Sequence, residues 1–118
     1  MAEENLELEA LVDEFSRLTR EISELLDDLR WRRPDVQEEI QRFEEAKRSG
    51  TPEGMGYVAS MQTFIQIWTK ILEEKEAELH KKARRWEELR RRIMEFTGQE
   101  IPPLPEEVFG APVHQEKE

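Results

Sequence analysis

The sequence predicts an all-α fold, a long antiparallel helical hairpin whose first arm is kinked or broken at Pro34 and which ends in an extended tail. Three observations predict it. Charged residues make up 39% and hydrophobic residues 36% of the 118 positions, a balance typical of long helices and coiled coils. Apolar residues recur at spacings of three and four, which is the helical period. The segment Ser49-Gly50-Thr51-Pro52 divides two such stretches of similar length.

The first arm has a wide apolar stripe between residues 8 and 29. About three of every seven positions are apolar, whereas a two-stranded coiled coil needs two, so this arm is expected to have neighbours on more than one side. The stripe consists of Leu8, Leu11, Val12, Phe15, Leu18, Ile22, Leu25, Leu26 and Leu29.

Pro34 interrupts the first arm, because proline removes a backbone donor and disfavours helical geometry just before it. The sevenfold apolar series nevertheless continues through Val36 to Phe43. We therefore expect a kinked arm that keeps its register. The alternative is a separate short helix over residues 35–48, which would give a three-helix bundle.

The turn and the second arm carry clear end signals. Gly50 can end a helix in left-handed geometry, Thr51 is a good N-cap, and Pro52 is tolerated at the first helical position. The second arm is expected over residues 52–97, with Gly98 closing it. Its sevenfold series comprises Val58, Ile65, Leu72, Leu79, Trp86 and Ile93.

Antiparallel pairing of the two series places Phe15 opposite Trp86 and Ile22 opposite Leu79. Charge supports this orientation, because the acidic residues 1–29 then lie along the basic run of residues 81–92. Exposed ion pairs are each worth under about 1 kcal/mol, so they set orientation more than stability.

The hairpin is expected to span residues 1–98 and to self-associate into a helical bundle. One partner helix cannot cover the whole stripe, and soluble monomers rarely leave such a strip open. A homo-oligomer is therefore expected. The candidate interface residues are Leu11, Leu25, Leu26, Phe64 and Ile71.

Residues 99–118 form a proline-rich tail with no helical or strand period, which predicts an extended or disordered conformation. Proline-rich segments lose little entropy on docking, so the tail is a candidate linear motif for a partner protein. Alternatively, it folds back along its own bundle. The candidate docking residues are Ile101, Pro102, Pro103, Leu104, Pro105, Val108 and Phe109.

Basic residues form a second candidate surface, for a partner protein or for nucleic acid. Trp86 falls on the core series and is expected to be buried, and the net charge of −10 opposes general nucleic-acid affinity. Nucleic-acid contact is therefore expected only within a larger complex. The candidate residues are Arg30, Trp31, Arg32, Arg33, Lys81, Arg84, Arg85 and Arg90.

The sequence gives little support for catalysis. There is no cysteine and only two histidines, His80 and His114, so thiolate chemistry is excluded and no nucleophilic triad can be assembled. The acidic pattern of Glu3, Glu4 and Glu7 with Glu24 and Asp27 fits helical magnesium-dependent nucleotide hydrolases, but both halves fall on one helix. We expect no enzyme, no cofactor and no bound metal.

No apolar run of eighteen residues and no basic, apolar leader occur, so a cytoplasmic protein without a membrane segment is expected. The leading functional hypothesis is a scaffold, adaptor or assembly factor that binds one or more proteins. The alternative is a small helical subunit of a nucleoprotein or nucleic-acid-processing complex.

Overall fold

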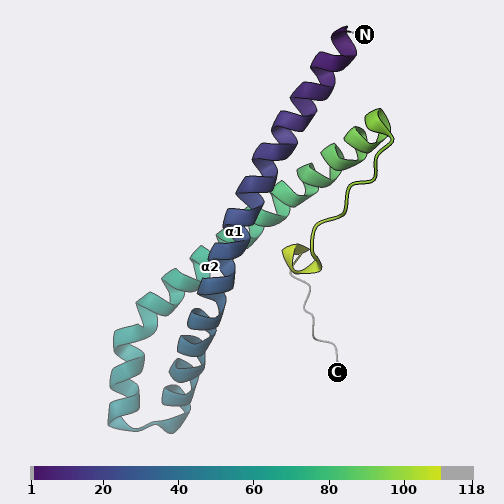
Figure 1. The fold of residues 1–118 in the computed structure, drawn as a ribbon. Helices are drawn as coiled ribbons and strands as arrows, with labels where there is room; N and C mark the ends of the chain where they lie inside the picture. Colours follow the sequence, from purple (N-terminus) through teal and green to yellow (C-terminus); the bar gives the residue numbers. More distant parts are fainter. Residues whose placement is uncertain (1, 110–118) are drawn as a thin grey trace. The chain divides into compact units, whose positions relative to one another are not determined.

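The computed structural model describes residues 2–109 and consists of two long helices and a short one (Figure 1). Helix α1 spans Ala2–Ser49, helix α2 spans Pro52–Thr97, and the 3-10 helix η1 spans Glu106–Phe109. The two long helices pack against each other as a hairpin, and the described residues contain no strand. The predicted all-α hairpin is therefore confirmed, with the second arm ending at the predicted residues.

Helix α1 runs through Pro34 without interruption, so the expected alternatives of a break and of a three-helix bundle are wrong. Pro34 is exposed. At an exposed position the proline ring meets no neighbouring segment, and the cost is limited to the missing N–H bond and the local clash within the helix. The rest of the arm supplies enough packing to keep the helix continuous.

The turn between the helices uses the residues that the sequence indicated. Gly50 has a φ of 65°, in the left-handed region where a side chain would be strained. The N–H of Gly54 donates to Thr51 Oγ1 at 3.0 Å, and the N–H of Met55 donates to the carbonyl of Thr51 at 2.9 Å. Thr51 therefore caps α2, as an N-cap threonine does.

The hairpin divides into two compact units, each of which holds part of α1 and part of α2. The first unit comprises Met1–Leu26 and Glu76–Glu118. Its core includes the stacked rings of Phe15 and Trp86, whose centroids lie 4.8 Å apart. This contact is the one that the antiparallel register predicted. The buried apolar residues of this unit are Leu11, Leu18, Ile22, Leu26, Leu79, Ala83, Trp86, Leu89, Ile93 and Val108.

The second unit comprises Asp27–Lys75 and includes the turn. Its buried apolar residues are Leu29, Val36 and Val58. Two polar contacts join its helices: Lys75 pairs with Asp28 at 2.9 Å, and the Tyr57 hydroxyl donates to Glu39 at 2.7 Å. The second unit therefore has a smaller apolar core than the first.

Between residues 2 and 109, neither long helix contains an apolar stretch of the length that crossing a membrane requires.

Candidate protein-interaction surfaces

Three ion pairs link α1 to α2 across one side of the first unit. Both oxygens of Glu14 accept hydrogen bonds from Arg85 at 2.9 Å. Glu21 pairs with Lys82 at 2.8 Å, and Arg92 contacts Glu7 at 3.2 Å. The predicted contact between the acidic arm and the basic run is thus confirmed.

The Glu14–Arg85 and Glu21–Lys82 pairs shift the pKa of the groups that make them. The hydrogen bond from Arg85 lowers the pKa of Glu14, and the bond from Lys82 lowers the pKa of Glu21. In return, the Glu21 carboxylate raises the pKa of Lys82. Each hydrogen bond favours the charged form of its partner. The carboxylates of Glu14 and Glu21 therefore stay charged to a lower pH than a free glutamate does.

Several members of the basic candidate surface already have partners within the chain. Arg85 is held by Glu14, and Arg90 donates to the carbonyl of Ile101 at 2.6 Å and pairs with Glu87 at 2.8 Å. Trp86 is 5% exposed and donates to Thr19 Oγ1 at 2.9 Å, so it cannot stack on a base in this conformation.

Two basic residues of this surface are exposed and unpaired. Lys81 and Arg84 are exposed and make no ion pair with the described residues. At the other end of the candidate surface, Arg30 pairs with Asp27 at 3.3 Å and Arg32 with Asp28 at 2.9 Å, both within α1. Arg33 is half-buried.

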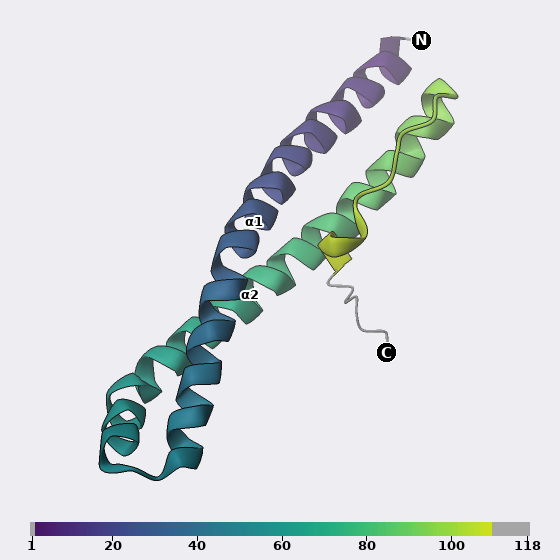
Figure 2. The ribbon, with the colours of Figure 1, turned by 60° about the horizontal axis from the view of Figure 1, so that its bottom comes forward.

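The described part of the tail runs back along α2 within the first unit (Figure 2). The N–H of Ile101 donates to Met94 Sδ at 3.2 Å, while its carbonyl accepts from Arg90. Val108 is fully buried, and Ile101 and Leu104 are half-buried. Pro102, Pro103 and Pro105 are exposed. Residues 101–109 therefore fold back along the helix, which was the alternative expectation for the tail. Residues 110–118, including His114, lie outside the described part.

Phe109 is the apolar tail residue that remains half exposed, at 50%. It lines a hollow of about 490 Å³ together with Arg84, Glu87, Glu88 and Arg91 of α2. The tail thus places an aromatic side chain among charged residues of the helix. Among the seven candidate docking residues, Phe109 is a large apolar residue whose side chain is half exposed to solvent.

The candidate oligomer residues have different surroundings. The expectation that a lone hairpin leaves Leu11 and Leu26 open is wrong, since each is only 6% exposed. Residues of the same chain therefore cover both side chains. Leu25 and Ile71 are half-buried. Phe64 is 52% exposed, as the sequence indicated.

The second unit exposes apolar and aromatic side chains on both of its helices. Trp31 is 79% exposed and Ile67 is 48% exposed. The ring of Phe64 stacks on Trp68 with centroids 5.9 Å apart. Because Phe64, Ile67 and Trp68 are three or four residues apart, they share one face of α2.

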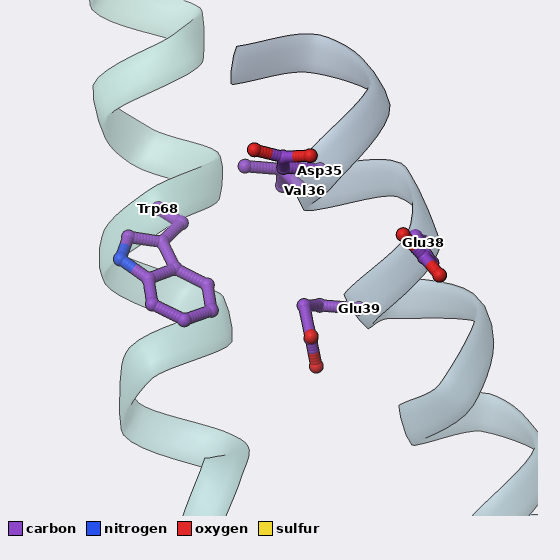
Figure 3. Close-up of a pocket in the computed structure, with 5 residues that line it drawn as sticks. All are labelled: Asp35, Val36, Glu38, Glu39 and Trp68. Atoms are coloured by element: carbon purple, nitrogen blue, oxygen red, sulfur yellow. The ribbon is translucent and has the colours of Figure 1, made fainter. Parts of the chain in front are cut away.

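A hollow of about 310 Å³ lies beside Trp68, and sequence reasoning missed it. Figure 3 shows the indole of Trp68 on one helix facing Asp35, Val36 and Glu39 on the other. Glu38 completes the lining. The carboxylate of Glu39 accepts a hydrogen bond from the Tyr57 hydroxyl, and this bond raises the pKa of Tyr57. The juxtaposition depends on which residues the two helices bring opposite each other, so no single stretch of sequence reveals it.

Within the described residues, no three or more histidine or acidic side chains come together as metal ligands would. His80 is half-buried, and its Nε2 has no hydrogen-bond partner among the described residues. The side chains of Glu3 and Glu4, which belong to the acidic pattern noted above, lie outside the described part.

No protein family matches the chain, and no match was found among the curated proteins or among the solved structures.

Proposed function

We propose that this chain is a non-enzymatic protein–protein interaction protein, a scaffold, adaptor or assembly factor that acts as a self-associating helical hairpin. The observation that carries the proposal is the exposed aromatic and apolar surface of the second unit. Trp31, Phe64 and Ile67 each expose about half or more of their surface. Contiguous apolar patches on folded proteins mark contact sites, and tryptophan is enriched at interface hot spots.

Burial of this surface would contribute favourable free energy to association. Burying a fully exposed phenylalanine or isoleucine side chain is worth roughly 1.5–3 kcal/mol. Phe64, Ile67 and Trp31 are already partly covered, so each supplies a fraction of its full value. A few such residues still supply several kcal/mol, part of which offsets the loss of translational and rotational freedom.

The tail supports the proposal in a narrower way than its sequence suggested. Val108 is buried and the backbone of Ile101 is engaged with α2, so a partner that took the whole segment would first have to displace it. Phe109 requires no such release, because half of its surface is free. We therefore propose that the tail contributes to binding through Phe109.

The nucleic-acid alternative has less support. Arg85 and Arg90 are engaged by acidic groups of the chain, and Trp86 is buried. Lys81 and Arg84 remain, and two phosphate contacts give weak binding that salt removes readily.

Size-exclusion chromatography coupled to light scattering tests self-association. We expect a mass of at least twice the 14.1 kDa of the single chain, with a concentration-dependent equilibrium. Phe64→Ser/Ile67→Ser should shift this equilibrium to the single chain. Leu6→Ser/Val12→Ser is the matched control, because these residues are exposed apolar side chains of the first unit. A mass of 14.1 kDa for the unmodified protein at all concentrations would contradict the proposal.

A further inference from the structure

We propose that copies of this chain associate through two unlike surfaces, which deepens the self-association proposed above and rests on it. The receiving surface is the hollow beside Trp68 in the second unit of one copy. The inserted surface is the basic stripe of Lys81, Arg84 and Arg91 with Phe109, in the first unit of another copy. Each surface is incomplete alone, and each supplies what the other lacks.

The receiving surface combines acidic groups with an aromatic wall. Asp35, Glu38 and Glu39 line it opposite Trp68. Arg42 pairs with Glu38 at 3.2 Å and with Glu39 at 3.1 Å, whereas Asp35 is exposed and has no ion-pair partner among the described residues. This surface therefore has the uncompensated negative charge of Asp35 beside the half-buried ring of Trp68.

Two further aromatic residues lie within about one helical turn of residues that line this hollow. Phe64 stacks on Trp68, and Trp31 lies one helical turn before Asp35 on α1, at the i, i+4 spacing of side chains that share a helix face. Trp31 is the most exposed large apolar side chain among the described residues, at 79%. An incoming surface with both cations and an apolar anchor fits this combination.

The inserted surface has that composition. Lys81, Arg84 and Arg91 are three and seven residues apart and are exposed, so they follow one face of α2. Phe109 lies beside Arg84 and Arg91. The acidic residues of the same hollow are occupied: Glu88 is paired with Arg85, and Glu87 with Arg90 and Arg91.

The chemistry favours contact between unlike surfaces over contact between like ones. A guanidinium or ammonium group over the face of tryptophan is stabilised by about 0.5–2 kcal/mol, depending on desolvation. Two acidic surfaces brought together would repel each other, and like-charge juxtaposition is costly at an interface. Nucleic acid fits the basic stripe alone and would leave the aromatic and acidic hollow without an occupant.

Charge reversal on each surface gives two complementary variants of the full chain. One is Asp35→Lys/Glu38→Lys, and the other is Lys81→Glu/Arg84→Glu. Each variant alone should self-associate at least about tenfold more weakly than the unmodified protein in low salt. The unmodified protein should also associate more weakly in about 0.5 M salt, because exposed charges are screened.

An equimolar mixture of the two variants is the decisive measurement. Each variant retains one native surface, so the mixture should form a mixed complex that neither variant forms alone. Glu44→Lys/Glu73→Lys is the matched control for Asp35→Lys/Glu38→Lys, because it changes the net charge by the same amount and in the same direction at exposed positions that do not line the hollow. This control should associate like the unmodified protein. Sedimentation velocity measures the unmodified protein, the two variants, their mixture and the control.

The outcomes separate this inference from the broader proposal. A monomeric unmodified protein would overturn both. Association that neither charge-reversed variant weakens, or a mixture that stays dissociated, would overturn the unlike-surface contact and leave self-association standing. Circular dichroism verifies the helical fold of each variant. If a reversal unfolds the chain, Asp35→Asn/Glu38→Gln and Lys81→Gln/Arg84→Gln replace it, and unchanged association of both would overturn the inference.

Discussion

Leu29 and Trp31 are two residues apart on α1 and have opposite surroundings. Leu29 is completely buried, whereas Trp31 is 79% exposed. Two residues correspond to about 200° of helical rotation, which turns the second side chain away from the seam that buries the first. Residue size therefore does not decide which of the two supports the fold, and the larger side chain is the one available to a partner.

Leu29→Ala should lower the free energy of unfolding by about 2–5 kcal/mol, because it leaves a cavity in the small core of the second unit. Trp31→Ala should change it by no more than about 0.5 kcal/mol, as exposed substitutions do. Urea denaturation followed by circular dichroism measures both. Equal losses for the two variants would show that Trp31 packs within its own chain.

The stacking of Phe15 on Trp86 could be predicted from sequence, because both residues occur on sevenfold series that mirror about the turn. The burial of Leu11 and Leu26 was not predicted. A helical stripe indicates which side chains face inward, but its width does not reveal whether the cover comes from another chain or from the same one. In this protein the cover of both side chains comes from the same chain.

At the scale of elements, the turn depends on one backbone conformation. Gly50 has a φ of 65°, and a Cβ added there would meet no atom within 4 Å. A side chain at this position would therefore suffer from backbone strain alone. Gly56 has equally open surroundings but lies within the regular geometry of α2. The two glycines make a matched pair.

Gly50→Ala should destabilise the hairpin by about 1–2 kcal/mol, the cost of left-handed geometry for a residue with a side chain. Gly56→Ala should stabilise it by roughly 0.5–1 kcal/mol, because alanine favours the helix. Thermal denaturation of the two variants gives the sign directly. Stabilisation by both substitutions would mean that Gly50 adopts another conformation in solution.

The helix ends were predictable because glycine, threonine and proline each act on the local backbone. Gly98, with a φ of 71°, ends α2 as the sequence indicated. The short helix η1 was not predicted, since four residues are too few to show a period. The burial of Val108 within it depends on contacts with distant residues. The sequence therefore predicted that the helix ends before the tail, but it did not predict that the tail packs against the rest of its unit.

At the scale of the whole molecule, ion pairs join α1 to α2 in both units. Glu14, Glu21 and Asp28 of α1 pair with Arg85, Lys82 and Lys75 of α2. The pKa of each of the three carboxyl groups is lowered, chiefly by the hydrogen bond from its basic partner. Their contribution to stability therefore depends on pH.

Stability should fall as the pH drops below about 4.5, the upper end of the ordinary carboxyl range. A carboxyl group with a lowered pKa in the folded state stabilises the fold above its unfolded pKa. This contribution is lost as the pH falls through the folded value. Thermal melting between pH 7 and pH 3 measures the effect. Glu14→Gln/Glu21→Gln should be less stable at pH 7 and should lose less on acidification, and an unchanged pH profile would contradict the assignment.

The alignment of the helices also limits how the length of this chain can change. One extra residue between Glu14 and Glu21 would rotate one of these carboxylates by about 100° away from its partner on α2, together with the apolar residues beside it. Seven extra residues would return the side chains to nearly the same face, provided that α2 lengthened equally. Extra residues next to Gly50 would leave these pairs intact. Length variation is therefore tolerated in the connection, and inside the arms only in matched multiples of seven.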